Sequence, residues 1–128
     1  FAGATYDPTS HYRAAAVFDF FEDIGLDPAR LREISQHQVG LLAEGFDALD
    51  LDPSLIARDR SVPLDQRGGF LALSSPAAGE ICKRLAGRDV VTDHRGPTLR
   101  LGPAPYLSDR QLRDAVVALA EVVTTLCA

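Results

Sequence analysis

Arg100 is the residue whose neighbours best suit it to bind a ligand. Along Thr98–Leu101, the alternation of a β-strand turns both leucines to one face and Arg100 to the other. The glycine and two prolines of Gly102–Pro105 follow at once and would hold the end of the strand still. A guanidinium held in this way suits bidentate capture of a carboxylate. The pattern by itself is equally compatible with an ordinary surface arginine.

Other residues with catalytic potential have less suitable surroundings. Lys83, the only lysine in the chain, lies in a helical segment on the side expected to face solvent. A lysine that forms a Schiff base needs a buried or cation-rich pocket, and Lys83 has neither. His11, His37 and His94 are isolated from one another, whereas metal sites need clustered ligands. We therefore predict no catalytic residue and no metal site in this chain.

The composition is that of a soluble globular domain. Of 128 residues, 46% are hydrophobic and 24% are charged, which fits one domain with a single core. The formal net charge of -5 disfavours nucleic acid as a partner. No apolar stretch approaches the roughly 20 residues that a membrane-spanning helix needs. We therefore predict a chain that binds neither nucleic acid nor a membrane.

The two cysteines and the start of the chain bear on its cellular context. Cys82 and Cys127 are too few for a secreted disulfide scaffold, so we expect free thiols in a reducing compartment. The first residues lack the basic and apolar regions of a signal peptide, which favours the cytoplasm. The chain opens at Phe1 without methionine. We interpret it as a piece of a longer protein, although tag removal or proteolysis would leave the same start.

The first half of the chain has the hydrophobic period of helices. The first predicted helix is His11–Ile24, with Thr9 or Ser10 as its cap and Gly25 as its end. Asp27 is expected to cap a second helix that fades near residue 48. The apolar residues expected on one face of the first helix are Ala14, Val17, Phe18, Phe21 and Ile24. Those of the second are Leu31, Ile34, Gln38, Leu41, Leu42 and Phe46.

The second half has the shorter period of strands. We predict strands at Phe70–Leu73, Val90–Thr92 and Thr98–Leu101, with a turn at His94–Pro97. A helix through Leu85 separates the first two strands. A last helix starts with Ser108 or Asp109 as its cap. The residues of this helix expected to face inward are Leu112, Val116, Leu119 and Val123. The predicted fold class is α+β, a small and mostly antiparallel sheet covered by helices on one face. Residues 1–128 are interpreted as one domain, with a loop at 1–9, a helical part at 10–57 and a sheet-and-helix part at 58–128.

Three of these segments, taken in order, resemble the C-terminal end of kynureninases: Arg67–Leu73, Val90–Arg95 and Leu99–Tyr106. That family shows an Arg-Gly before a strand, then a helix, an apolar pair with Asp-x-Arg, and an Arg-Leu-Gly-x-Ala-Pro-like segment. The resemblance covers nearly the whole chain. Kynureninases belong to the broader class V aminotransferase-like group, which has the type I pyridoxal-phosphate fold. The resemblance therefore implies the C-terminal small domain of such an enzyme.

The resemblance also implies roles for individual residues. Arg100 matches the family arginine that binds the substrate α-carboxylate. Thr5 falls where relatives carry a Gly-Thr-Pro-Pro-like loop near the cofactor phosphate, which a hydroxyl can bond. Here Tyr6, Asp7 and Pro8 stand in place of the two prolines, so Tyr6 is a candidate substrate contact. The alternative is that this segment is only the entry to the first helix.

The activity implied by the resemblance is hydrolysis of kynurenine to anthranilate and alanine by a pyridoxal 5'-phosphate enzyme. The lysine and most cofactor contacts would belong to an N-terminal large domain that this chain lacks, so the isolated chain would be inactive. The parent would be a cytoplasmic homodimer acting on a small amino-acid substrate. Two alternatives stay open. One is aminotransferase or cysteine desulfurase activity on the same scaffold, and the other is a non-enzymatic binding or dimerisation module.

Overall fold

The computed structural model describes residues 7–126, which fall into two compact units. The first unit extends to Arg32 and the second begins at Glu33. Helix α1 (Thr9–Asp23) belongs to the first unit, and α2 (Pro28–Ala48) begins there and continues into the second.

The start of α1 differs from the sequence prediction. We expected Thr9 or Ser10 to cap the helix from outside, but Thr9 is its first residue. The N-cap is Pro8, and the Asp7 carboxylate just before it accepts hydrogen bonds from the Thr9 amide at 2.9 Å and from the Thr9 hydroxyl at 2.6 Å. These bonds from Thr9 lower the pKa of Asp7. Asp7 therefore binds a free amide of the first turn, the role that we expected of the Thr9 or Ser10 hydroxyl.

The predicted end of α1 and the predicted cap of α2 are confirmed. Gly25 follows α1 with a φ of +68°, the left-handed conformation that glycine adopts most easily. The carboxylate of Asp27 accepts a 2.7 Å hydrogen bond from the Arg30 amide at the first turn of α2. The end of α1 and the start of α2 therefore follow directly from the local sequence.

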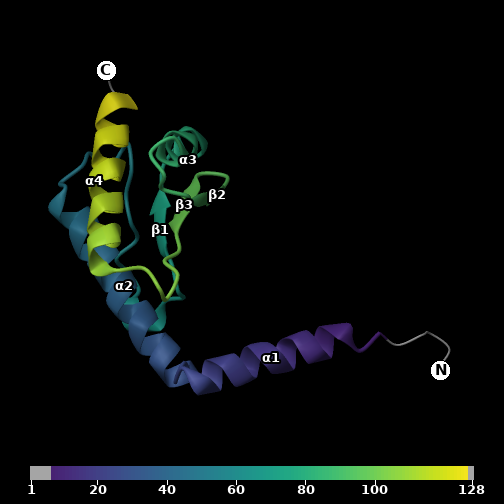
Figure 1. The fold of residues 1–128 in the computed structure, drawn as a ribbon. Coiled ribbons are helices and arrows are strands. Elements are labelled where there is room, and N and C mark those ends of the chain that lie inside the picture. Colours follow the sequence, from purple (N-terminus) through teal and green to yellow (C-terminus); the bar gives the residue numbers. More distant parts are fainter. Residues whose placement is uncertain (1–6, 127–128) are drawn as a thin grey trace. The chain divides into compact units, whose positions relative to one another are not determined.

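The second unit contains a three-stranded sheet and its covering helices (Figure 1). After α2 come a short 3-10 turn (Leu64–Gln66), β1 (Leu71–Ser74), α3 (Ala78–Ala86), β2 (Asp93–Arg95), β3 (Thr98–Leu101) and α4 (Asp109–Leu126). The strand order is β1-β3-β2, and both pairings are antiparallel. The predicted α+β class with an antiparallel sheet is confirmed.

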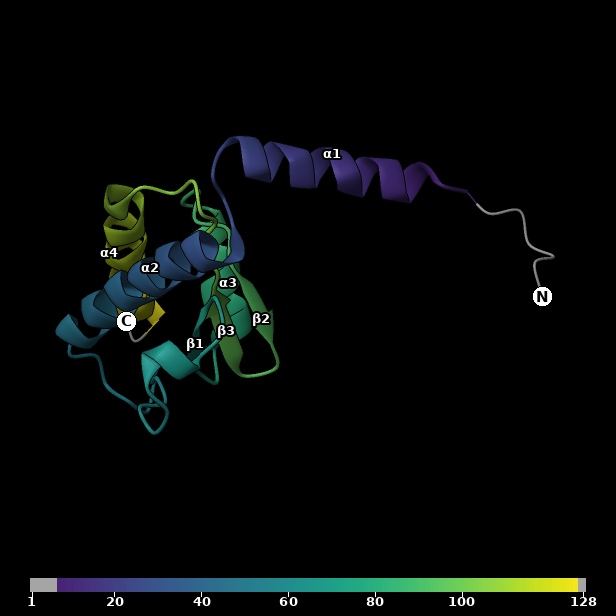
Figure 2. The same ribbon diagram turned by 90° about the horizontal axis from the view of Figure 1, so that it is seen from below.

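The core lies between one face of the sheet and the helices α2, α3 and α4. Strand alternation directs the leucines of β1 and β3 to this face, and Figure 2 shows α2 and α4 together on one side of the strands. At Gly45, an added Cβ would lie 3.2 Å from a methyl group of Val116, so the glycine permits a close approach of α2 to α4. The central buried residues are Leu42, Phe46, Leu73, Ile81, Leu85, Leu99, Leu112, Val116, Leu119 and Val123.

The hairpin of the sheet is shifted from its predicted place. We expected a strand at Val90–Thr92, but β2 is Asp93–Arg95 and the turn is formed by Gly96 and Pro97. The amide of Val90 donates a 3.0 Å hydrogen bond to the Leu85 carbonyl and so closes the end of α3 instead of joining the ladder. Apolar side chains suggested a strand here, yet Val91 is 89% exposed.

The last helix begins with the cap that its sequence indicates. Ser108 accepts a 3.4 Å hydrogen bond from the Gln111 amide, and the Gln111 side chain accepts one from the Ser108 amide at 2.9 Å. This reciprocal arrangement is a capping box. All four residues predicted to face inward from α4 are buried.

Asp47 fastens the segment after α2 back onto that helix. Its carboxylate accepts a 2.7 Å hydrogen bond from Nε of Arg58, pairs with a second Arg58 nitrogen and accepts one at 2.6 Å from Arg60. The Arg58 hydrogen bond lowers the pKa of Asp47 from 3.8 to about 2. Ala57, next to Arg58, forms an antiparallel bridge with Ser74. The carboxylate therefore connects α2 with the chain that borders the sheet.

We expect Asp47→Asn to destabilise the chain at pH 7 by about 1–2 kcal/mol, since the side chain is partly screened by solvent. Because folding lowers the pKa of Asp47 from 3.8 to about 2, its stabilisation is present above about pH 4 and is lost as the pH falls toward 2. Urea denaturation at pH 7 and pH 2.5 should show the difference from wild type shrinking at the lower pH. Asp114→Asn, at a carboxylate 69% exposed and 3.7 Å from Arg110, is the control and should change stability little. A pH-independent difference for Asp47→Asn contradicts the prediction.

Candidate functional site

Arg100 lies at the centre of the sheet, on the face away from the core. It belongs to β3, the middle strand, and stands opposite Ala72 of β1 and Asp93 of β2. Its strand neighbours Leu99 and Leu101 are 0% and 5% exposed, as the alternation predicted. The leucines therefore anchor the strand in the core while the arginine is presented on the opposite face.

Two neighbours hold the guanidinium of Arg100. Asp93 forms an ion pair with its terminal nitrogen Nη2. The ring centroid of Phe70 lies 5.6 Å from the central guanidinium carbon, within the range of a cation–π contact. The arginine side chain is 24% exposed, whereas that of Asp93 is 59% exposed. The guanidinium is thus partly desolvated, which strengthens its electrostatic interactions relative to those of a fully hydrated arginine.

A hollow of about 350 Å³ opens beside this guanidinium. Two of its lining residues contain buried polar atoms that have no hydrogen-bond partner among the described residues: Nε of Arg100 and the hydroxyl of Thr92. An unmade hydrogen bond of this kind costs about 1–3 kcal/mol. The site can therefore gain energy from a ligand whose acceptor oxygens reach these unpaired groups. The full lining is Phe70, Val91, Thr92, Asp93, Arg100 and Gly102.

The other predicted site residues, Thr5 and Tyr6, lie outside the described residues. Their assignments as cofactor contact and substrate contact stay predictions. The structure adds Asp93 and Phe70, which the sequence analysis did not single out as site residues. The signal for Asp93 was the two-residue Gly96-Pro97 turn, because a tight hairpin there places Asp93 opposite Arg100.

Lys83 and the histidines occupy structural or exposed positions. Lys83 is exposed on α3. His37 lies 2.9 Å from Asp109, joining α2 to α4. The His94 ring packs over Gly79, where an added Cβ would lie 3.2 Å from it. Within residues 7–126 there is no group of three or more histidine, cysteine or carboxylate side chains placed to hold a metal ion. Nor does any helix in that range have the length and apolar character to span a membrane.

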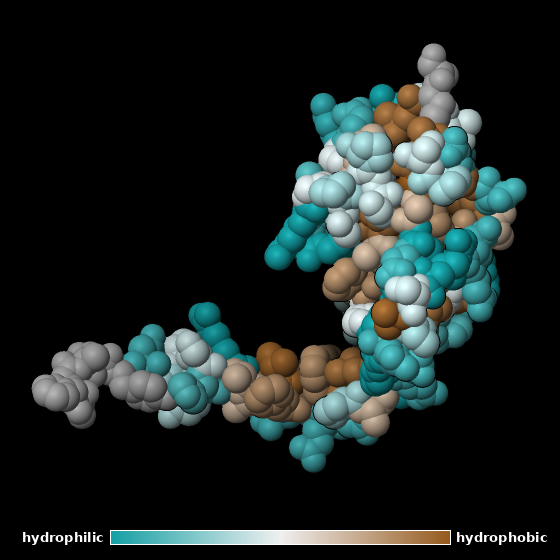
Figure 3. Space-filling view, turned by 180° about the vertical axis from the view of Figure 1, so that it is seen from behind, coloured by the Kyte–Doolittle hydropathy of each residue, from teal (hydrophilic) through white to brown (hydrophobic). Residues whose placement is uncertain are grey.

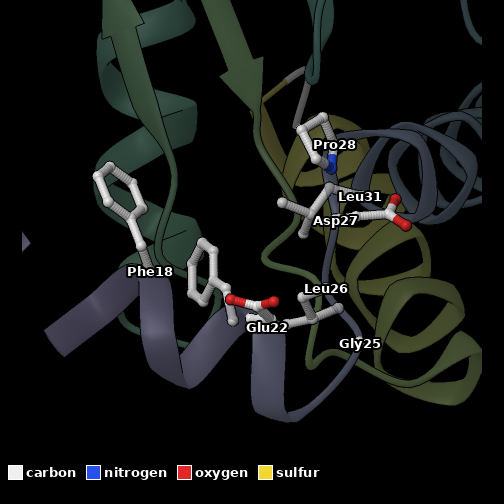
Figure 4. Close-up of a pocket in the computed structure, with 8 residues that line it drawn as sticks. Phe18, Glu22, Gly25, Leu26, Asp27, Pro28 and Leu31 are labelled. Atoms are coloured by element: carbon white, nitrogen blue, oxygen red, sulfur yellow. The ribbon is translucent and has the colours of Figure 1, made fainter. Parts of the chain in front are cut away.

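The first unit contains a second, more apolar hollow of about 620 Å³. Figure 4 shows Phe18 on α1 and Leu31 on α2 at its sides, with Leu26 between the helices. No residue of α1 is buried, and Phe18 is 67% exposed. Apolar side chains gather on the C-terminal half of α1 (Figure 3). This hollow contains few polar atoms to orient a ligand, so it is a weaker candidate for a chemical site than the one beside Arg100.

Comparison with known families gives one match. The family model for the kynureninase C-terminal domain matches residues 31–119, which is more than half of the chain. No match was found among curated proteins. The matched range includes Phe70, Asp93 and Arg100 and leaves out α1.

Proposed function

The chain belongs to the kynureninase C-terminal domain family, and on that premise we propose that it is the small domain of a hydrolase that converts kynurenine to anthranilate and alanine. The observation that carries the proposal is the guanidinium of Arg100, which is half-buried on the open face of the sheet with a buried Nε lacking a partner. Its role in this proposal is to bind the α-carboxylate of the substrate.

The geometry of Arg100 supports carboxylate binding in particular. A guanidinium offers parallel N–H donors that match the two oxygens of a carboxylate, and lysine has no equivalent. The face of Phe70 supports the plane of this group at 5.6 Å. Every substrate of the proposed class has an α-carboxylate. In binding it, Arg100 would orient the rest of the substrate toward the reacting groups.

The described residues do not fit pyridoxal phosphate, the cofactor of this enzyme family. The one lysine of the chain, Lys83, is exposed on α3 and does not line the hollow beside Arg100. Thr5, the predicted phosphate contact, lies outside the described residues. The lysine that binds the cofactor would therefore belong to a separate large domain of the parent enzyme. The contribution proposed for this chain is recognition of the substrate's carboxylate.

The proposal is tested on the complete polypeptide that contains this chain, purified with pyridoxal phosphate. Kynurenine is added, and anthranilate is followed by its fluorescence. Formation of anthranilate is the expected result. A cofactor absorbance band without anthranilate contradicts the substrate assignment, and assays for keto acid or for sulfide release from cysteine then identify transamination or desulfuration. Absence of cofactor binding contradicts the enzymatic assignment and favours a non-enzymatic module.

A further inference from the structure

We propose that Asp93 is a positioning residue, which holds one end of the Arg100 guanidinium so that the other end stays available to a substrate carboxylate. The inference rests on the proposed function of Arg100 and adds a second residue to the same site. Asp93 stands directly opposite Arg100 in the β2–β3 pairing and forms an ion pair with it on the open face. The hairpin register therefore determines which carboxylate meets the guanidinium.

Asp93 and Phe70 restrain Arg100 from different directions. A free arginine side chain samples many rotamers, and fixing it is one of the costs of binding a ligand. The ion pair fixes Nη2, and the Phe70 ring lies 5.6 Å from the central carbon. Both partners come from the sheet region itself, on chain that precedes β1 or forms β2. Much of the ordering of Arg100 is therefore already achieved before a ligand binds.

The pattern of contacts also leaves the site open. Asp93 pairs with Nη2 alone, and the described residues give Nη1 no hydrogen-bond partner. Nε is enclosed and also unpartnered. An internal carboxylate that bridged two guanidinium nitrogens would block the site, because it would use the paired donors that a substrate carboxylate needs. Nη2 has two N–H groups, each forming a parallel pair with a neighbouring nitrogen, so a contact through one of them uses one pair and leaves the other to a substrate carboxylate.

The opposite role, in which Asp93 competes with the substrate for Arg100, makes opposite predictions. The Asp93 side chain is 59% exposed and has a negative charge, so it could repel an incoming carboxylate. If repulsion dominated, removing the charge would strengthen substrate binding. If positioning dominates, as we propose, removing it weakens binding. A substitution of Asp93 therefore distinguishes the two roles by the sign of its effect.

The first test measures the motion of Arg100 and needs no substrate. In the 128-residue chain, the ¹⁵N relaxation of the Arg100 Nε–H group, assigned by its loss in Arg100→Lys, reports the order of the side chain. We expect an order parameter near the rigid value of about 0.85 in the wild type and below about 0.6 in Asp93→Ala. Asp93→Asn, which keeps an acceptor oxygen, should restore part of the order. Asp114→Ala, at an exposed carboxylate on α4, is the matched control and should change nothing. Equal order in wild type and Asp93→Ala overturns the proposal.

The second test uses the complete polypeptide and separates KM from kcat. Asp93→Ala should raise KM for kynurenine about two- to tenfold, the usual effect of releasing one immobilised side chain, and should leave kcat nearly unchanged. An unchanged KM overturns the proposal, and a lower KM assigns Asp93 the competing role. If the wild-type polypeptide forms no anthranilate, the proposed function fails, and the relaxation measurement still decides whether Asp93 positions Arg100.

Discussion

Arg100→Ala is expected to lower kcat/KM for kynurenine in the complete enzyme by about a hundred- to ten-thousandfold. The alanine removes two charge-assisted hydrogen bonds to the substrate carboxylate, each worth about 1.5–3 kcal/mol. Arg100→Lys should recover only part of the loss, because an ammonium keeps the charge but lacks the planar fork. Steady-state rates from anthranilate fluorescence give both values.

A loss of activity assigns this role to Arg100 only if the fold is preserved. The Asp93 side chain is 59% exposed, and the Arg100 Nε has no partner among the described residues, so we expect Arg100→Ala to change the free energy of unfolding by less than about 1 kcal/mol. Arg110→Ala is the matched control, since Arg110 is 90% exposed on α4. An activity loss for Arg100→Ala no larger than that for Arg110→Ala contradicts the assigned role.

The parts of the fold that the sequence predicted well are those whose residues are buried on one face. In α4 the four residues at helical spacing all enter the core, and in β3 alternation separates Leu99 from Arg100. Burial of a periodic apolar stripe is a large energetic term, so it leaves a clear pattern in the sequence. The order of elements and the antiparallel sheet followed from these stripes.

The parts that the sequence predicted poorly depend on local hydrogen bonds. The strand expected at Val90–Thr92 is displaced because the Val90 amide closes the end of α3. The Thr9 amide at the start of α1 is bound by Asp7, although Thr9 and Ser10 offered equally suitable side chains for the free amides there. Such choices differ by about 1 kcal/mol, which is too small a difference for composition alone to decide.

In the candidate site, too, the sequence predicted what depends on one strand and missed what depends on contacts between strands. Arg100 could be placed on the open face from alternation alone, since that requires only the local strand. Its partner Asp93 depends on the hairpin register, and the predicted strand was three residues too early to bring them together. Phe70 was included in the first predicted strand but lies just before β1. Contacts between strands therefore required the three-dimensional structure.

Leu99→Ala is expected to destabilise the chain by about 2–5 kcal/mol, the usual cost of a large cavity in a core. Leu99 is 0% exposed and belongs to the middle strand, where it faces the helices together with Leu73. Domains of this size have total stabilities of about 5–15 kcal/mol, so the variant should lose a large share of its stability. Urea denaturation followed by circular dichroism measures the difference.

The matched control for this variant is Val91→Ala. Val91 is 89% exposed, so its truncation should change the free energy of unfolding by less than about 0.5 kcal/mol. The pair also tests the position of the hairpin, because a strand at Val90–Thr92 that buried Val91 would make this substitution costly. A loss of 2 kcal/mol or more for Val91→Ala would place the strand where the sequence alone suggested it.

Leu99 and Arg100 are adjacent in the chain but face opposite sides of the sheet, so their variants should separate stability from function. Leu99→Ala should lower stability while the folded fraction of the complete enzyme keeps its KM for kynurenine. Arg100→Ala should leave stability nearly unchanged but raise the KM for kynurenine. If Leu99→Ala raised KM as much as Arg100→Ala, the guanidinium would depend on the exact packing beneath β3. In that case the strand, and not only its exposed face, would have to be counted as part of the binding site.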